Sequence, residues 1–202
     1  MAGVSQGGLA QRRVFLNVPY DAGYEQNFLA LIVALISIGR IPRCAVEEPV
    51  LGRNRMARIF KLIKSCNVSI HDLCRVGPPP RFNIPFELGI AFALARLEGH
   101  KFIVMESKQY RMDVTLSDLK GVDPLVHSNS PRRVISRILG ELGSTRGAPD
   151  IEQVMEIFRH LRSLVPKLKK GHRATKVFYR PVFHALVAAA TEQAVARRLI
   201  NP

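Results

Sequence analysis

Short apolar runs alternate with amphipathic segments along the first two thirds of the chain. The run RVFLNV at 13–18 is rich in β-branched and aromatic residues, as strands are, and Pro19 ends it. Residues 55–65 instead repeat apolar positions at helical spacing and place Arg and Lys side chains on the opposite side. On these grounds we expect strands at 13–18, 43–46, 68–71 and 101–105. We expect helices at 25–38, 55–65, 85–97, 131–142, 151–164 and 181–199.

This alternation predicts an α/β fold of the flavodoxin-like, doubly wound type, in which helices cover both faces of a parallel sheet. The strand at 68–71 is short and apolar at adjacent positions, so we expect it to be buried on both faces inside the sheet. Ser130 precedes the helix at 131–142 as a predicted N-cap. Residues 106–130 are expected to be largely irregular.

The chain divides into a leader, one α/β domain and a C-terminal helical appendage. Residues 1–12 have no apolar stretch before a cleavage site, so we interpret them as a flexible leader. The α/β domain covers 13–142, the segment GSTRGAP at 143–149 is a predicted linker, and 150–202 form the helical extension. The last helix carries an apolar stripe formed by Val182, Leu186, Val187, Ala190, Ala194 and Leu199. We expect this stripe to bury against the main domain or a second subunit. If a second subunit covers it, the C-terminal helices form a homo-oligomer, which is our prediction for the assembly.

Composition and charge restrict the function classes. The 202 residues are 47% hydrophobic, and no apolar run reaches the roughly 18–20 residues of a membrane span. The three cysteines Cys44, Cys66 and Cys74 form no CxxC pair, which favours a reducing cytoplasm. The net charge is +14, and residues 151–202 hold ten Lys or Arg against three acidic residues. A nucleic-acid-associated protein therefore stays an alternative, although no known docking motif accompanies the charge.

One carboxylate, Glu87, lies inside the apolar segment RFNIPFELGIAFAL at 81–94. Glutamate is rarely buried without a partner, because its charge must leave water. If Ile84 is the N-cap and Pro85 the first helical residue, Glu87 is the third and can cap the helix. The same position also suits a reactive carboxylate, which the helix N-terminus would keep ionised at neutral pH. Both interpretations stay open on local grounds.

Ligands of doubly wound folds bind beyond the carboxyl ends of the strands. Polar side chains that follow predicted strands, or begin the next helix, are Tyr20, Asp21, Asp72, Arg81, Asn83 and Glu87. Each has an ordinary interpretation, such as a turn cap for Asp72 or a solvated charge for Arg81. Their joint occurrence predicts one cleft, with Glu87 and Asp72 catalytic and Tyr20, Asp21, Arg81 and Asn83 binding the substrate.

The segment FELGIAFALARLEGHKFIVM, after a strand that ends at Asp72, resembles the nucleoside 2-deoxyribosyltransferase family. It is also similar to the related Toll/interleukin-1 receptor (TIR)-like NAD-glycohydrolase domains. The transferase motif of glutamate, leucine and glycine, with alanine two residues on, matches Glu87, Leu88, Gly89 and Ala91 here. VFLNVPYD resembles the first strand and base-binding loop of such domains, and the likeness covers roughly residues 13–140.

The resemblance implies cleavage or transfer of an N-glycosidic bond in a nucleotide, a nucleoside or NAD. Glu87 would attack the anomeric carbon, Asp72 would hold or protonate the leaving base, and Tyr20 would stack on the base or bind the sugar. No cofactor or metal is implied, and NAD enters only as a candidate substrate. Arg81 and Asn83 replace an aspartate- and glycine-rich sequence of the transferases, which favours a phosphate-bearing ligand.

Other functions compete with this one. A signalling or assembly module of the same fold could bind a nucleotide without turnover. The sequence lacks a GxGxxG fingerprint, which argues against redox chemistry on a dinucleotide, and its six histidines show no metal-ligand spacing. His71 and Cys74 are three residues apart, but nothing else in the sequence supports a Cys–His nucleophile.

Overall fold

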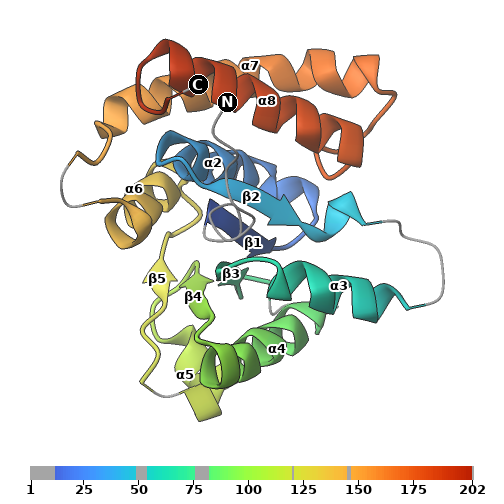
Figure 1. Ribbon diagram of the computed structural model, residues 1–202, viewed down its shortest axis with the longest axis vertical. Helices are drawn as coiled ribbons and strands as arrows, with labels where there is room; N and C mark the ends of the chain where they lie inside the picture. The colour runs from blue at the N-terminus through green and yellow to red at the C-terminus, as the bar shows by residue number, and fades with distance from the viewer. Residues whose placement is uncertain (1–11, 49–53, 76–81, 120, 145–146, 202) are drawn as a thin grey trace, which may run out of the picture. The chain divides into compact units, whose positions relative to one another are not determined.

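The computed structural model describes residues 12–48, 54–75, 82–119, 121–144 and 147–201 (Figure 1). The predicted ligand residue Arg81 therefore lies outside the described residues. The chain forms two compact units. The first contains the described residues up to Pro19 and Ile41–Ser128, and the second contains Tyr20–Arg40 and the residues from Asn129 onward.

The first unit holds a parallel sheet of five strands in the order β2-β1-β3-β4-β5. The strands are β1 (Arg13–Asn17), β2 (Ile41–Cys44), β3 (Val68–Asp72), β4 (Lys101–Glu106) and β5 (Leu125–Val126). The prediction of an α/β fold with a parallel sheet is confirmed. β3 holds the central place, and all five of its residues are buried, as expected for 68–71.

Two strands differ from the sequence prediction. β2 begins two residues before the predicted start at 43, and it includes Pro42. A proline fits there because β2 is an edge strand, where one missing N–H breaks no ladder on the outer side. β5 lies inside the segment 106–130 that we expected to be irregular. A strand of two residues has no alternating pattern to detect, and its pairing with the end of β4 defines it.

The helical elements of the first unit are η2 (Ala45–Glu47), α3 (Arg55–Lys64), α4 (Asn83–Glu98), α5 (Arg111–Thr115) and η3 (Ser117–Leu119). α4 packs against β1, β3 and β4, and α3 packs beside α4. Leu73, Ile84, Leu88, Val104 and Met112 form a buried cluster between α4, α5 and the sheet. This packing fixes the start of α4 against the central strands.

The second unit is built around α2. Its elements are η1 (Ala22–Tyr24), α2 (Glu25–Ser37), α6 (Pro131–Leu142), α7 (Ile151–Gly171) and α8 (Arg180–Ala196). α2 contacts α6, α7 and α8, and every residue from Asn27 to Ser37 is buried. The centroid of the Phe28 ring lies 5.0 Å from that of the Phe178 ring and 5.8 Å from that of the Phe183 ring. These contacts explain why α2 is apolar on almost all sides.

The predicted apolar stripe is buried in part: Val187 is only partly buried, and Leu199, also partly buried, lies beyond the end of α8 at Ala196. Val182, Leu186, Ala190 and Ala194 are fully buried, and α8 contacts α2 and α7 of the same chain. The stripe therefore needs no second subunit to cover it, and the homo-oligomer stays a prediction. The predicted domain boundaries at 13–142 and 150–202 stay predictions as well.

The bounds of α6 follow local signals, whereas those of α7 do not. α6 covers the predicted 131–142, and the Ser130 hydroxyl accepts a hydrogen bond from the Arg133 N–H at 3.4 Å, as expected for an N-cap. α7 continues past the predicted end at 164 and includes Pro166. Pro166 is exposed, so water can satisfy the carbonyl that loses its helical partner.

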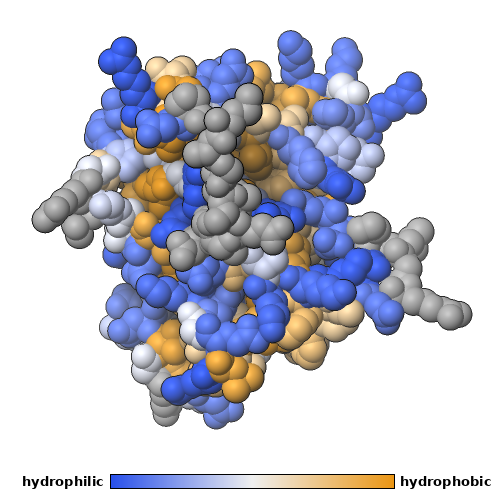
Figure 2. Space-filling view, in the orientation of Figure 1, coloured by the Kyte–Doolittle hydropathy of each residue, from blue (hydrophilic) through white to orange (hydrophobic). Residues whose placement is uncertain are grey.

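The described helices are all too short or too polar to cross a lipid bilayer. Hydrophilic side chains cover much of the face seen in Figure 2, with apolar side chains between them. This surface agrees with a chain that carries 30 basic and 16 acidic residues.

Candidate functional site

Polar side chains gather where the strands of the first unit end. Asn17 ends β1, Asp72 ends β3, Glu106 ends β4, and His127 directly follows β5. All four side chains are buried. Because the strands are parallel, these carboxyl ends lie at one edge of the sheet, where ligands of open α/β folds bind.

Asp72 makes contacts with both of its oxygens. Oδ1 accepts a hydrogen bond from the Cys74 N–H at 3.0 Å, and Oδ2 lies 3.0 Å from Nε2 of His127. The side chains of Asp72 and His127 are both fully shielded from solvent. Burial raises the pKa of the Cys74 thiol well above its usual range, and the Asp72 charge raises it further. The thiol is therefore protonated at neutral pH.

The negative charge of Glu106 is compensated by Arg111, the first residue of α5. Arg111 Nε donates to Oε2 of Glu106 at 2.9 Å, and a terminal guanidinium nitrogen pairs with Oε1. The Ser107 N–H also donates to Oε1, at 2.6 Å. The same guanidinium reaches the Leu73 carbonyl oxygen at 3.5 Å. Glu106 and Arg111 thus join the ends of β4 and β3 and leave no bare buried charge at Glu106.

A relay of hydrogen bonds crosses the interior of the sheet. His100 Nδ1 lies 3.0 Å from the Cys66 carbonyl oxygen, so this nitrogen carries the proton and donates it. His100 Nε2 must then accept from the Ser69 hydroxyl at 2.9 Å. Ser69 Oγ in turn accepts from His71 Nε2–H at 2.7 Å. These tautomers are assigned from the network, and both imidazoles are neutral in it.

The relay ends at the first turn of α4. His71 Nδ1 accepts from the Asn17 amide at 2.8 Å, and the same amide nitrogen donates to the Ile84 carbonyl oxygen at 2.9 Å. Burial, with a smaller contribution from the neighbouring His100, lowers the pKa of His71 to about 3. Burial also lowers the pKa of His100. The neutral relay therefore persists at physiological pH and ties the end of β1 to the start of α4.

Glu87 lies beyond the first turn of α4, which corrects two predictions. The helix begins at Asn83 with Phe82 as N-cap, so Pro85 is the third helical residue and Glu87 the fifth. Glu87 is therefore too far along the helix to cap it. Proline is tolerated at the third position because its backbone nitrogen would have no helical partner there. The predicted N-cap at Ile84 is wrong.

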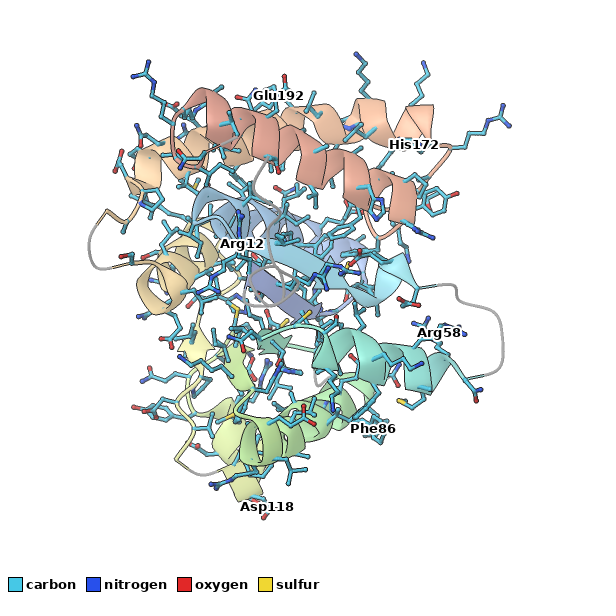
Figure 3. The ribbon with its side chains drawn as sticks, in the orientation of Figure 1. Arg12, Arg58, Phe86, Asp118, His172 and Glu192 are labelled. Atoms are coloured by element: carbon cyan, nitrogen blue, oxygen red, sulfur yellow. The ribbon has the colours of Figure 1, made fainter. Side chains whose placement is uncertain are left out.

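The environment of Glu87 also differs from the one expected. Its side chain is 7% exposed, whereas the preceding Phe86, labelled in Figure 3, is 55% exposed. Burial raises the pKa of Glu87 to about 7, and the Arg55 charge opposes this rise only in part. The expected full ionisation at neutral pH is thus wrong, because desolvation outweighs the helix N-terminus beyond the first turn.

The predicted site residues are divided between the two units. Asp72 and Glu87 belong to the first unit, on β3 and on the helix that packs against it. Asn83 is exposed at the start of α4. Tyr20 and Asp21 belong to the second unit, where the Tyr20 ring lies 5.3 Å from the Phe178 ring. The single cleft therefore stays a prediction.

Sequence reasoning missed three residues at this edge of the sheet. Glu106, Arg111 and His127 all lie in the segment 106–130 that we expected to be irregular. The only local signal is the pair of apolar residues before His127, in PLVH.

Comparison with protein-family models, with curated proteins and with solved structures gives no match to this chain.

Proposed function

We propose that the chain cleaves or transfers the N-glycosidic bond of a nucleotide, a nucleoside or NAD, with the Glu87 carboxylate as the nucleophile. The observation that carries this proposal is the state of Glu87, a buried carboxyl group whose pKa is raised to about 7. Carboxyl groups with pKa values moved towards neutrality are concentrated at functional sites, because ordinary packing avoids them. The resemblance to the transferases assigns the same glutamate.

The topology around Glu87 supports the assignment. The strand order β2-β1-β3-β4-β5 supports the proposal of a flavodoxin-like doubly wound fold, in which ligands bind where the order reverses between β1 and β3. Asn17 and Asp72 end those two strands. Asn17 also holds the Ile84 carbonyl oxygen, three residues before Glu87. The reversal point and the start of α4 are thus joined by a direct hydrogen bond.

The reaction then follows from the chemistry of the carboxylate. Ionised Glu87 attacks the anomeric carbon, the bond from carbon to the base nitrogen breaks, and the base leaves with the electron pair and takes up a proton. Water or a second base then attacks the glycosyl ester, and Glu87 is released as a carboxylate. With a pKa of about 7, roughly half of the molecules hold an ionised Glu87 at neutral pH.

The other predicted residues take supporting roles in this proposal. Both oxygens of Asp72 face protein groups, so Asp72 is better suited to position His127 and Cys74 beside the departing base than to protonate it directly. Asn83 is exposed at the start of α4, and a helix N-terminus suits a phosphate. Arg81 lies outside the described residues and stays a proposed phosphate ligand on sequence grounds. Tyr20 and Asp21 stay proposed ligands of the base or sugar.

The setting of the protein is proposed on similar grounds. The described cysteines, Cys44, Cys66 and Cys74, are all free and buried, which fits a reducing cytoplasm. The ligand is a nucleotide or nucleoside, and the assembly is a homo-oligomer. Nucleic acid stays the alternative partner because of the net charge of +14.

A substrate panel tests the proposal. The purified chain is incubated at pH 8 with NAD, nucleotides, ribonucleosides and deoxynucleosides, and the free base is quantified by chromatography. We expect base release from at least one member, faster with phosphate-bearing substrates. A chain that releases no base from any of them, but binds one in equilibrium dialysis, would instead be a nucleotide-binding module.

A further inference from the structure

We propose that Asp72, Cys74 and His127 form a binding site for a divalent transition-metal ion, with zinc as the best fit. The site lies at the carboxyl ends of β3 and β5, and it is independent of the nucleophile Glu87. The inference goes beyond the proposed glycosidic chemistry, which requires no metal.

The donor atoms are already close together. One ligand atom from each of Asp72, Cys74 and His127 lies within 4.8 Å of the other two, and all three residues are buried. Asp72 Oδ2 and His127 Nε2 are 3.0 Å apart. Ligand atoms at about 2.0–2.3 Å from a tetrahedral zinc ion lie about 3.3–3.8 Å from one another. Small side-chain rotations would therefore complete the coordination geometry.

The backbone holds the two ligand-bearing segments in place. The Leu73 N–H, between Asp72 and Cys74, donates to the Met105 carbonyl oxygen at 2.9 Å. The His127 N–H donates to the Glu106 carbonyl oxygen at 2.9 Å. Both segments are therefore fixed to consecutive residues of β4. Ligands on rigid elements are what a specific metal site needs, because little order must be imposed when the ion binds.

The chemistry of the set selects the ion. A carboxylate, a thiolate and an imidazole together match borderline-soft zinc better than magnesium or calcium, which require several oxygen ligands. Zinc with one carboxylate, one thiolate and one neutral imidazole carries no net charge. Such neutrality matters among three buried side chains, because an isolated buried charge is costly. Displacement of the Cys74 proton would accompany binding.

The second oxygen of Asp72 has a supporting role. Oδ1 accepts the Cys74 N–H at 3.0 Å, which orients the carboxylate and leaves Oδ2 as the ligand atom. Three protein ligands leave a fourth position of a tetrahedral ion for water or a substrate atom. An ion held in this way would place a Lewis acid at the strand ends, where the ligand of an open α/β fold binds.

Cobalt substitution tests the site without any substrate. The full chain, without a histidine tag, is stripped with a chelator and titrated with Co²⁺, and then Zn²⁺ is used to displace the cobalt. We expect one ion per chain and a near-ultraviolet charge-transfer band from thiolate to cobalt. Metal content after gel filtration gives the zinc stoichiometry. A wild-type chain that retains no metal, or a cobalt complex that lacks the thiolate band, would overturn the proposal.

Variants identify the thiolate. Cys74→Ser should lose the band and bind zinc at least about tenfold more weakly, a loss that even supporting residues of metal sites produce. Cys66→Ser is the matched control, because Cys66 is also free and buried but precedes β3 rather than following it. A band that survives in Cys74→Ser contradicts the assignment. If Cys74→Ser does not fold, the wild-type and Cys66→Ser spectra still decide. Base release plays no part in these readouts, so either proposal can fail alone.

Discussion

Replacement of Glu87 by glutamine should stabilise the fold, and the gain should grow with pH. Burial moves the pKa of Glu87 from 4.5 to about 7. Between these values the folded chain holds a proton that the unfolded chain releases, so the free energy of unfolding falls as pH rises. Glutamine keeps the shape of the protonated carboxyl group and cannot ionise. Above pH 4.5 the wild type loses stability because the buried Glu87 must ionise, and Glu87→Gln does not lose it.

The size of the effect follows from the same values. At pH 8 both states of the wild type ionise Glu87, and the penalty is about 3 kcal/mol at 1.36 kcal/mol per pH unit. At pH 5 most of the folded chain is still protonated at Glu87, and the penalty is about 1 kcal/mol. The stability difference between Glu87→Gln and the wild type should therefore grow by about 2 kcal/mol from pH 5 to pH 8.

Urea unfolding followed by far-ultraviolet circular dichroism measures this difference at both pH values. Glu98→Gln is the matched control, because Glu98 ends the same helix but is largely exposed and pairs with Lys64 at 2.6 Å. That variant should change stability by no more than about 1 kcal/mol. A Glu87→Gln difference that stays constant from pH 5 to pH 8 would refute the reasoning. A capping glutamate would instead make this variant less stable.

Three further results are expected. Base release by the wild type should rise with pH to half its maximum near pH 7, because only ionised Glu87 attacks, and a profile flat from pH 6 to pH 8 would contradict this. The pKa of His71 is lowered to about 3, so the wild type loses stability as pH falls below 6.5. In urea unfolding, His71→Gln should remove about 1.5 kcal/mol of that loss between pH 6.5 and pH 5. An unchanged dependence of the free energy of unfolding on pH would count against the neutral relay. Glu25 accepts from Lys169 Nζ at 2.7 Å and from the Val177 N–H at 3.2 Å, so Glu25→Gln should cost about 1–3 kcal/mol, and an unaltered melting temperature would disprove that role.

Elements with a strong local pattern could be predicted from the sequence. The strand β3 and the helix α6 lie close to their predicted bounds. Adjacent apolar residues predict the buried strand, and Ser130 directly before the helix predicts its start. α5 and β5 were not predicted, since they are five and two residues long and depend on contacts with β4 and the core. Local patterns fix an element only when it is long enough to show its period.

The candidate site shows the same division. Asp72 could be singled out because it follows a predicted strand, and Glu87 because it interrupts an apolar run, where a carboxylate is unusual. His127 was not predictable, because it joins the site only through its Nε2 atom, which lies 3.0 Å from Asp72, a residue 55 positions earlier in the chain. The ionisation of Glu87 was misjudged for a related reason. Its pKa depends on how deeply α4 buries it, and the sequence pattern does not give that depth.

Turnover by Glu87→Gln tests the central claim most directly. The rate of base release at pH 8 is compared among the wild type, Glu87→Gln and the control Glu98→Gln, with the best substrate of the panel. We expect Glu87→Gln to be slower by a factor of about 1,000 or more, because the attacking carboxylate is gone, while Glu98→Gln keeps the wild-type rate. Since Glu87→Gln should be at least as stable as the wild type, unfolding would not explain the loss. Release by Glu87→Gln within a few-fold of the wild-type rate would contradict the assignment of Glu87 as the nucleophile.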